Sequence, residues 1–434
     1  ELTVGIDVGT RNVRVIIGES RRDSLEIEVV GACSVPSTGI EAGVIRNVGR
    51  TTEDIVRAIS DAEKMAGLAI SSVWVSISAE HVSSRPNSAR VKISQSEVDD
   101  LDVERVLEQA STQCSPSDLI VSTFPTEFLV DEVGTRDDPR GMCGGVLESR
   151  VQLISGDKTA IQTLVKCIKA AGLGVDGIIF SPFAGARASL HRDEEELGVA
   201  VVDIGAGVTD LVISHEGALV HTAVLPIGGD YITRDIHLGL RTPQHEAERL
   251  KIHHGEALQA NVDESETVDV PGVGGRPPRT EKRMELVSII EARALEIMTY
   301  VADNLLSSGY RDRLHGGVVL IGGTAEMSGF DDLATQVLRD RLGVPDLQVR
   351  RGYPLGITGM VDLCRSPANC TSVGLLKCAT DLDLARCFYL APEEAEPSVA
   401  RSMRVRTAGG GGGAGQRGLF GRFFGWFRAA FFPD

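Results

Sequence analysis

The sequence predicts an α/β fold with mixed sheets and two similar halves. One observation is a short apolar run that ends in a glycine turn, at residues 2–10 and again at 198–207. A second apolar run resumes after each turn, at 13–18 and 209–214, and a looser third copy covers 318–324. The other observation is helical spacing of apolar residues between these runs, at 50–66, 157–171 and 330–342. Strands that alternate with helices indicate an α/β fold, and the repetition indicates two halves.

Two segments interrupt this pattern. In residues 80–154 the sequence predicts strands at 119–125 and 146–154 and a helix at 102–113, which indicates an inserted subdomain. Residues 231–308 are polar and mostly helical in pattern, with a loop of glycine, proline and arginine at 273–279.

Composition and charge narrow the class of protein. The chain has 434 residues, of which 42% are hydrophobic and 24% charged, as in globular proteins. A net charge of −17 argues against a broad nucleic-acid surface. Residues 401–434 carry six Arg and one Asp, so the tail has a formal charge of +5 and the remainder −22. The eight cysteines form no Cys-x-x-Cys pair, which indicates reduced thiols of a cytosolic protein.

Each of the first two glycine turns follows an aspartate at the end of a strand, Asp7 or Asp203. The backbone N–H groups of such a turn can cradle phosphate oxygens. A carboxylate at the strand end can hold Mg²⁺ through water. One such turn is common in ordinary hairpins, but two of them with a later Gly322-Gly323-Thr324 predict a nucleotide between the halves. The alternative is hairpin turns in unrelated sheets.

These motifs resemble those of the actin-like ATPases. Residues 5–10 and 202–210 resemble the two phosphate motifs, and residues 320–324 resemble the adenosine motif. More narrowly, the chain is similar throughout to the FtsA family of bacterial cell-division proteins; residues 43–45, 181–190, 273–279 and the basic C-terminus carry the likeness. The resemblance implies an actin-like (ribonuclease H-like) two-domain ATPase fold with an inserted 1C subdomain and a C-terminal amphipathic helix.

The resemblance also implies the division of the chain into subdomains. The expected segments are 1–79, 155–196 and 356–390 for subdomain 1A, 80–154 for 1C, 197–230 and 310–355 for 2A, 231–309 for 2B, 391–416 for a flexible linker and 417–434 for a membrane-targeting helix.

Carried over residue by residue, the resemblance implies a site for ATP and Mg²⁺. The expected nucleotide residues are Gly9, Thr10, Arg11 and Asn12 in the first phosphate loop, Gly205, Ala206, Gly207, Val208 and Thr209 in the second, Gly322, Gly323 and Thr324 near the adenosine, and Glu248 and Lys251 near the base and ribose. Asp7 and Asp203 are expected near Mg²⁺, through water. For Glu248 and Lys251 a solvated helix face is an equal alternative.

Two features depart from the family pattern. Ala206 replaces the middle glycine of the usual three, which leaves the backbone less room to approach a phosphate. Arg11 and Asn12 replace the lysine or small hydroxyl residues of many actin-like enzymes. No residue is identified that would position an attacking water. We therefore expect ATP binding with at most slow hydrolysis, and the catalytic residues stay unknown.

The C-terminal tail predicts a membrane-surface helix. Six of the twelve Phe and one of the two Trp fall in its last residues. At ~100° per residue most of them share one face, bordered by arginines. The expected membrane residues are Leu419, Phe420, Arg422, Phe423, Phe424, Trp426, Phe427, Arg428 and Phe431. Such a face suits an in-plane helix on anionic lipid. The alternative is a terminal helix docked on the protein's own core.

Arg276, Arg279 and Arg293 form a basic group within 231–309. Surface salt bridges are one interpretation. The family resemblance implies another, in which this surface binds the acidic C-terminal peptide of FtsZ.

Taken with the tail, the resemblance implies an ATP-binding protein that polymerises and tethers FtsZ filaments to the cytoplasmic face of the inner membrane at the division septum. Other division proteins would bind through 1C. The alternative is a phosphotransferase of the sugar-kinase type on the same superfold. A kinase would need a catalytic Asp and a substrate pocket, and it has no use for the aromatic tail. A chaperone ATPase would need a β-rich domain after residue 390.

Overall fold

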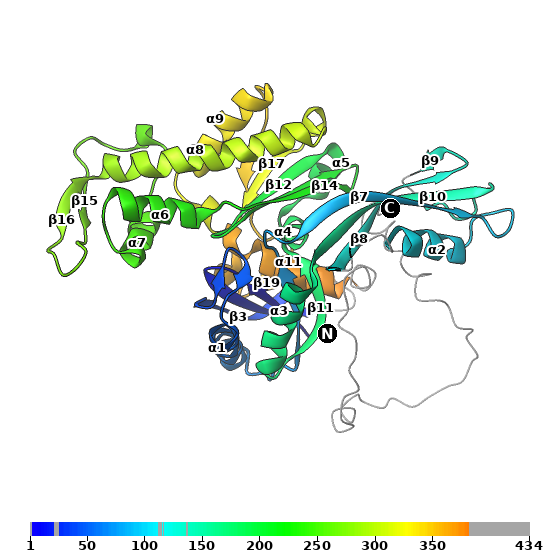
Figure 1. Ribbon diagram of the computed structural model, residues 1–434, viewed down its shortest axis with the longest axis horizontal. Coiled ribbons are helices and arrows are strands. Elements are labelled where there is room, and N and C mark those ends of the chain that lie inside the picture. The colour runs from blue at the N-terminus through cyan, green and yellow to red at the C-terminus, as the bar shows by residue number, and fades with distance from the viewer. Residues whose placement is uncertain (1, 21–25, 112–114, 116, 136–137, 382–434) are drawn as a thin grey trace.

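The computed structural model describes residues 2–20, 26–111, 115, 117–135 and 138–381. The predicted linker and tail helix, with all nine expected membrane residues, lie outside these residues. In the described part, one sheet forms the core of each half, a third sheet extends to one side, and a helical arm extends to the other (Figure 1). The predicted alternation of strands and helices is present in both halves.

The first half is built on a six-stranded sheet in the order β11-β6-β1-β2-β3-β19. These strands are β1 Leu2–Val8, β2 Asn12–Ser20, β3 Ile27–Pro36, β6 Ser72–Ile77, β11 Gly174–Phe180 and β19 Ile357–Gly359. Helices α1 (Val48–Ala66) and α3 (Lys158–Ala170) lie where the apolar spacing predicts them. The Asn47 and Asp157 side chains cap their first turns by accepting backbone N–H groups. A short hairpin, β4 (Ile40–Glu41) with β5 (Val44–Ile45), precedes α1.

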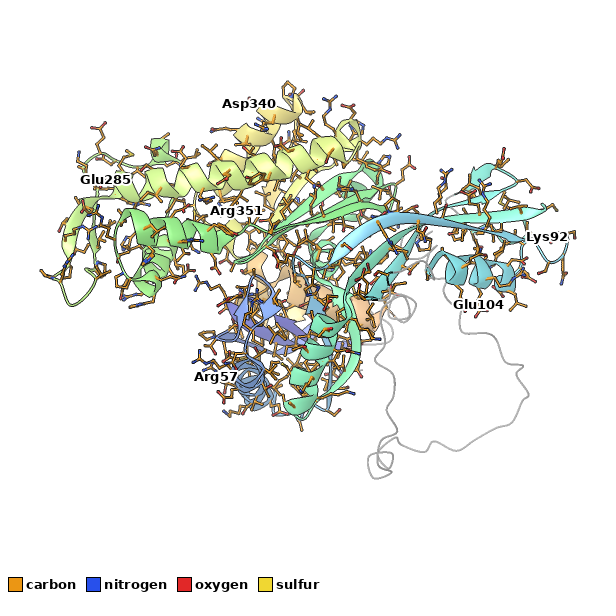
Figure 2. All side chains as sticks on the ribbon, in the orientation of Figure 1. Arg57, Lys92, Glu104, Glu285, Asp340 and Arg351 are labelled. Atoms are coloured by element: carbon orange, nitrogen blue, oxygen red, sulfur yellow. The ribbon has the colours of Figure 1, made fainter. Side chains whose placement is uncertain are left out.

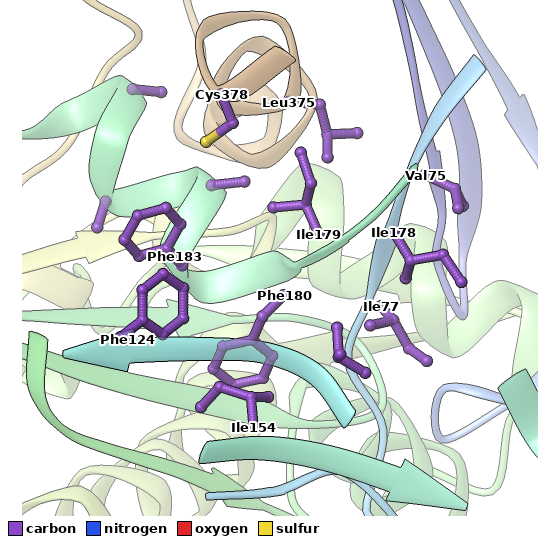
Figure 3. Packing of buried hydrophobic residues seen from close by; sticks show 14 of the residues in the cluster. Val75, Ile77, Phe124, Ile154, Ile178, Ile179, Phe180, Phe183, Leu375 and Cys378 are labelled. Atoms are coloured by element: carbon purple, nitrogen blue, oxygen red, sulfur yellow. The ribbon is translucent and has the colours of Figure 1, made fainter. Parts of the chain in front are cut away.

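A four-stranded sheet in the order β7-β10-β8-β9, with helix α2 (Asp100–Ser111), forms the inserted unit. Its strands are β7 Ser83–Lys92, β8 Asp118–Val130, β9 Val133–Thr135 and β10 Val146–Asp157. The sequence pattern does not reveal β7, because this edge strand is polar and contains a proline. Phe124 of β8 packs on Phe183, with ring centroids 4.6 Å apart (Figure 3), so the insert shares the core of the first half.

The second half contains a five-stranded sheet in the order β14-β13-β12-β17-β18. Its strands are β12 Val199–Ile204, β13 Thr209–His215, β14 Ala218–Leu225, β17 Gly317–Ile321 and β18 Val349–Arg351. Alternate residues of β12 belong to two different cores: Val201 packs with the first half, and Val202 packs with helices of the second. Both faces of this sheet are therefore buried, which explains its continuous apolar runs.

The helical arm comprises α6 (Gly229–Gly239), α7 (Gln244–His254) and the long α8 (Arg283–Ser307). The helical pattern of this segment is present, but the chain also forms a hairpin, β15 (Thr267–Val270) with β16 (Arg279–Lys282), that the pattern does not reveal. Helix α9 (Phe330–Leu342) packs beside α8. The exposed side chains of Glu285 on α8 and Asp340 on α9 project outward (Figure 2).

Helices α4 (Ser181–Ser189) and α11 (Cys370–Thr380) pack against each other in the core of the first half. They meet backbone to backbone, since a Cβ on Gly374 would lie 1.7 Å from the carbonyl oxygen of Ala184. The partly buried amino group of Lys377, on α11, donates to the carbonyl oxygen of Arg187 on α4 at 3.4 Å. Burial, with the nearby charge of Arg187, lowers the pKa of Lys377 to about 8.

Replacing Lys377 by methionine removes the cost of burying an ammonium group. Because the folded pKa of about 8 lies below the ordinary value of 10.5, the unfolded chain binds more protons between these pH values and stability rises there with pH. We expect K377M to exceed the wild type in unfolding free energy by about 1–3 kcal/mol at pH 7. The gain should shrink towards zero at pH 10.5. Urea titration at both pH values measures it, and an equal gain at both would contradict this account.

Candidate functional site

Two glycine turns of matching geometry meet in the cleft between the halves. The N–H of Gly9 donates to the carbonyl oxygen of Asn12 at 3.1 Å, in the turn between β1 and β2. The N–H of Gly205 donates to the carbonyl oxygen of Val208 at 3.0 Å, in the turn between β12 and β13. Each sheet therefore presents the same tight backbone shape to the cleft, which is typical of sites for anionic oxygens.

The two turns approach each other closely at Gly207. A Cβ there would lie 2.6 Å from Cα of Ala42 and 2.7 Å from Oγ1 of Thr10. Glycine is thus required where the halves touch. Ala206, the departure from the family's three glycines, does not have a positive φ, so an alanine fits this position without backbone strain.

The cleft holds a cavity of about 880 Å³, within the range of small-molecule sites. The predicted residues that line it are Asp7, Gly9, Thr10, Arg11, Asn12, Asp203, Gly205, Ala206, Gly207, Val208, Glu248, Lys251, Gly322, Gly323 and Thr324. Thr209 does not line it, because its buried hydroxyl donates to the carbonyl oxygen of Ile227 at 2.8 Å. The structure therefore brings together residues from four separate parts of the sequence.

Three carboxylates lie at the floor of this cavity, and each accepts hydrogen bonds from hydroxyl groups. Asp7 accepts from Ser76 at 2.6 Å and lies 3.6 Å from the guanidinium of Arg14. The other two are bonded across the halves. Thr371 of α11 donates to Asp203 at 3.0 Å, and Ser78 donates to both oxygens of Asp210 at 2.6 Å.

Burial, together with neighbouring negative charge, disfavours the ionisation of Asp203 and Asp210. Burial, and next the charge of Asp7, raise the pKa of Asp203 to about 6. Burial and the charge of Asp203 raise the pKa of Asp210 well above its ordinary value. A cation placed here would relieve both effects. Within the described residues, no group of three or more His, Cys, Asp or Glu side chains is arranged to hold a metal directly. The donors present therefore fit a cation held mainly through water.

Glu248 and Lys251 of α7 form an ion pair at 2.8 Å on the wall of the cavity. The buried Lys251 amino group also donates to the carbonyl oxygen of Gly229 at 3.1 Å and to Thr233 at 2.8 Å. Burial opposes ionisation of Glu248, yet the charge of Lys251 and the hydrogen bonds from Lys251 and Thr233 together outweigh it and lower the pKa of that carboxyl. Both residues line the cavity, and Lys251 is buried.

Asp210 lines the cavity but is not among the residues predicted from sequence, although the sequence contains a signal for it. In the β12–β13 hairpin, Asp203 pairs directly with Asp210, and in the β1–β2 hairpin Asp7 pairs with Arg14 at the same spacing. Both partners line the cavity. Because the two turns belong to equivalent hairpins, the residue seven positions after each aspartate pairs with it and is a candidate for the same site.

The three arginines predicted for a partner lie on the helical arm, away from this cavity. Arg279 donates to Glu281 at 2.5 Å, and Arg293 donates to Asp235 at 2.6 Å and lies over the ring of Tyr231 at 5.7 Å. Arg276 precedes β16 and is exposed. Salt bridges within the chain, one of the two interpretations from sequence, are thus present at Arg279 and Arg293.

Among the described residues, no helix has the length and apolar character to cross a bilayer.

Solved structures show which fold this is. A chain of the PilM–PilN type IV pilus biogenesis complex superposes with a TM-score of 0.61 at 16% identity, over 86% of this chain and 97% of that one. MreB 5 of Spiroplasma citri bound to AMPPNP gives a TM-score of 0.50 at 14% identity, over 86% and 94% of the two chains. The predicted actin-like fold is confirmed.

Sequence relatives identify the family. Family models described as "Cell division protein FtsA" and "SHS2 domain inserted in FTSA" match residues 200–374 and 79–155. The FtsA of Pseudomonas aeruginosa is 40% identical over 377 residues, which cover 87% of this chain and 88% of that protein. The chain belongs to the FtsA family of actin-like cell-division proteins, as its motifs predicted.

The carboxylate floor predicts a gain in stability when one charge is removed. Asparagine at position 210 keeps an acceptor for Ser78 but removes the buried charge beside Asp203. Without nucleotide or Mg²⁺ at pH 8, we expect D210N to raise the unfolding free energy by about 1–3 kcal/mol. Urea titration measures the change, with the exposed Asp346→Asn as control. Lower stability of D210N would show that this carboxylate holds the empty cleft together.

Proposed function

We propose that this protein is an ATP-binding, membrane-attached adaptor of the bacterial division ring that polymerises and tethers FtsZ filaments to the cytoplasmic membrane. The observation that carries the proposal is the pair of equivalent turns, Gly9–Asn12 and Gly205–Val208, joined to carboxylates at one cleft. Membership of the FtsA family supports the cell-division role. The site of action would be the inner face of the membrane at the septum.

ATP with Mg²⁺ is the ligand that this cleft fits best. The turns at Gly9 and Gly205 would hold phosphate oxygens, Gly322 to Thr324 would lie by the adenosine, and Glu248 with Lys251 by the base and ribose. Asp7 and Asp203 would hold Mg²⁺ through water, where the cation offsets their mutual repulsion. The related fold of MreB 5 was solved with AMPPNP, an ATP analogue, which supports this choice.

The subdomain division follows from the same proposal. The six-stranded half would be 1A, the inserted sheet 1C, the five-stranded half 2A and the helical arm 2B, with the boundaries expected from sequence. Contacts between unlike faces of successive copies extend without closing, which is what a filament requires. Other division proteins would bind 1C.

Membrane attachment rests on the composition of the tail. Phe423, Trp426 and Phe427 would enter the lipid interface, and Arg422 and Arg428 would reach anionic headgroups. A single short helix binds lipid weakly, but a filament presents many of them and gains avidity. Nucleotide would therefore control membrane binding through polymerisation.

Co-sedimentation with liposomes tests this proposal. We expect the full-length chain to pellet with anionic vesicles, more strongly with ATP, and a chain that ends at Gly415 to stay in the supernatant. Binding should fall as salt is added, because the attraction to headgroups is screened. A matched control, F423S/F427S, keeps every arginine and should also lose binding. If the full-length chain stays in solution with every vesicle and nucleotide, the tether role is excluded.

For the FtsZ peptide, the proposed surface is that of Arg276, Arg279 and Arg293. The two paired arginines already hold carboxylates of their own chain, so an acidic peptide would exchange with Glu281 and Asp235.

We expect R279A and R293A each to weaken binding of the FtsZ C-terminal peptide by about tenfold, the scale of a charge-assisted hydrogen bond. Fluorescence anisotropy of a labelled peptide measures this. Arg311→Ala, an exposed arginine outside the arm that pairs with Asp312, serves as control and should bind normally. Unchanged peptide binding by both arm variants would place the FtsZ surface elsewhere.

A further inference from the structure

One ion pair crosses the mouth of the cleft and joins the two halves. The guanidinium of Arg11, in the turn between β1 and β2, donates from Nε to Oδ1 of Asp230 at 2.7 Å. Its Nη2 lies 3.4 Å from Oε2 of Glu248. Asp230 is in the first turn of α6 and Glu248 is on α7, so both carboxylates belong to the opposite half.

This ion pair links the turn at Gly9–Asn12 to the turn at Gly205–Val208. The N–H of Asp230 donates to the carbonyl oxygen of Ala206 at 2.8 Å, and the N–H of Gly229 donates to that of Gly205 at 2.9 Å. The start of α6 is therefore fixed to the second turn. Arg11, which stands in the first turn, reaches the second through Asp230.

The pair is accessible enough to be exchanged. The side chains of Arg11 and Asp230 are 36% and 30% exposed, and ion pairs that reach solvent contribute little to stability. Glu248 has a nearer cation than Arg11, since the amino group of Lys251 lies 2.8 Å from its carboxylate. Asp230 is thus the carboxylate that holds Arg11 in place.

We propose that Arg11 is an exchangeable ligand for the terminal phosphates of a nucleoside triphosphate, and that Asp230 competes with the nucleotide for it. The proposal depends on the ATP site described above. A guanidinium binds phosphate through two parallel hydrogen bonds and more strongly than it binds one carboxylate oxygen. Arg11 lines the cavity directly beside the turn from Gly9 to Asn12, so a change of rotamer brings it to a phosphate there.

Competition gives the two partners of one ion pair opposite effects on affinity. Removing the Arg11 guanidinium takes away a phosphate ligand, whereas neutralising Asp230 frees that guanidinium and removes a negative charge near the phosphates. A pair that served only to hold the halves together would behave differently, since loss of either partner would weaken binding alike.

The test is isothermal titration of full-length protein with ATP and with AMP in the presence of Mg²⁺. We expect R11A to weaken ATP binding about tenfold. R11K keeps the positive charge but cannot make two parallel hydrogen bonds, and it should weaken binding less. D230N should tighten ATP binding about threefold. AMP, which lacks the terminal phosphates, should bind all variants almost equally.

The matched control is the exposed pair of Arg341 and Asp303, joined at 2.6 Å between α9 and α8. R341A and D303N should leave ATP affinity unchanged. Thermal unfolding checks that each variant folds, and D230N tests the proposal even where R11A does not fold.

The outcomes separate the two proposals. If the wild type does not bind ATP, the proposed function fails and this inference fails with it. If the wild type binds ATP but D230N weakens binding or leaves it unchanged, the ATP site stands and competition by Asp230 is excluded. If R11A weakens AMP as much as ATP, Arg11 does not bind the terminal phosphates.

Discussion

Three carboxylates, Asp7, Asp203 and Asp210, concentrate negative charge where the sheets of the two halves meet. Asp7 and Asp203 are the second-last residues of β1 and β12, and the hairpin partner of Asp203 is a third aspartate, Asp210. Folding brings these groups from both halves into one cavity, away from bulk water. Burying several like charges costs folding free energy in the empty protein, and such clusters are typical of sites that bind a cation or another charged ligand.

Hydroxyl groups satisfy the two carboxylates of the second half without neutralising them. Ser78 and Thr371, both from the first half, donate to Asp210 and Asp203. Hydroxyl donors stabilise the ionised form but carry no charge, so the negative charge of these two groups is not cancelled by their donors. The halves are thereby joined across the cleft by polar contacts that respond to the charge of a ligand bound there.

Much of this could be predicted from sequence because the signals are local. The apolar runs, the glycine turns and the periodic helices, such as α9 at Phe330–Leu342, are read directly from residue order. The edge strand β7 and the hairpin β15–β16 could not be, since their polar residues lack a clear alternation and pair only in the tertiary context. The hydrogen bonds of Asp210 and the partner of Arg11 depend on contacts across more than a hundred residues, which no local pattern contains.

Two contacts near the cleft differ in kind, and this difference bears on how a ligand could act. Within the first half, α4 and α11 are packed so closely at Gly374 and Ala184 that no side chain fits between them. Across the cleft, the halves meet through Arg11 and Asp230, partly in water. A close-packed core resists change, whereas an ion pair that reaches solvent can exchange its partner. Phosphates and a cation in the cleft would therefore change the contact of Arg11 with Asp230 and leave the packing of α4 on α11 intact.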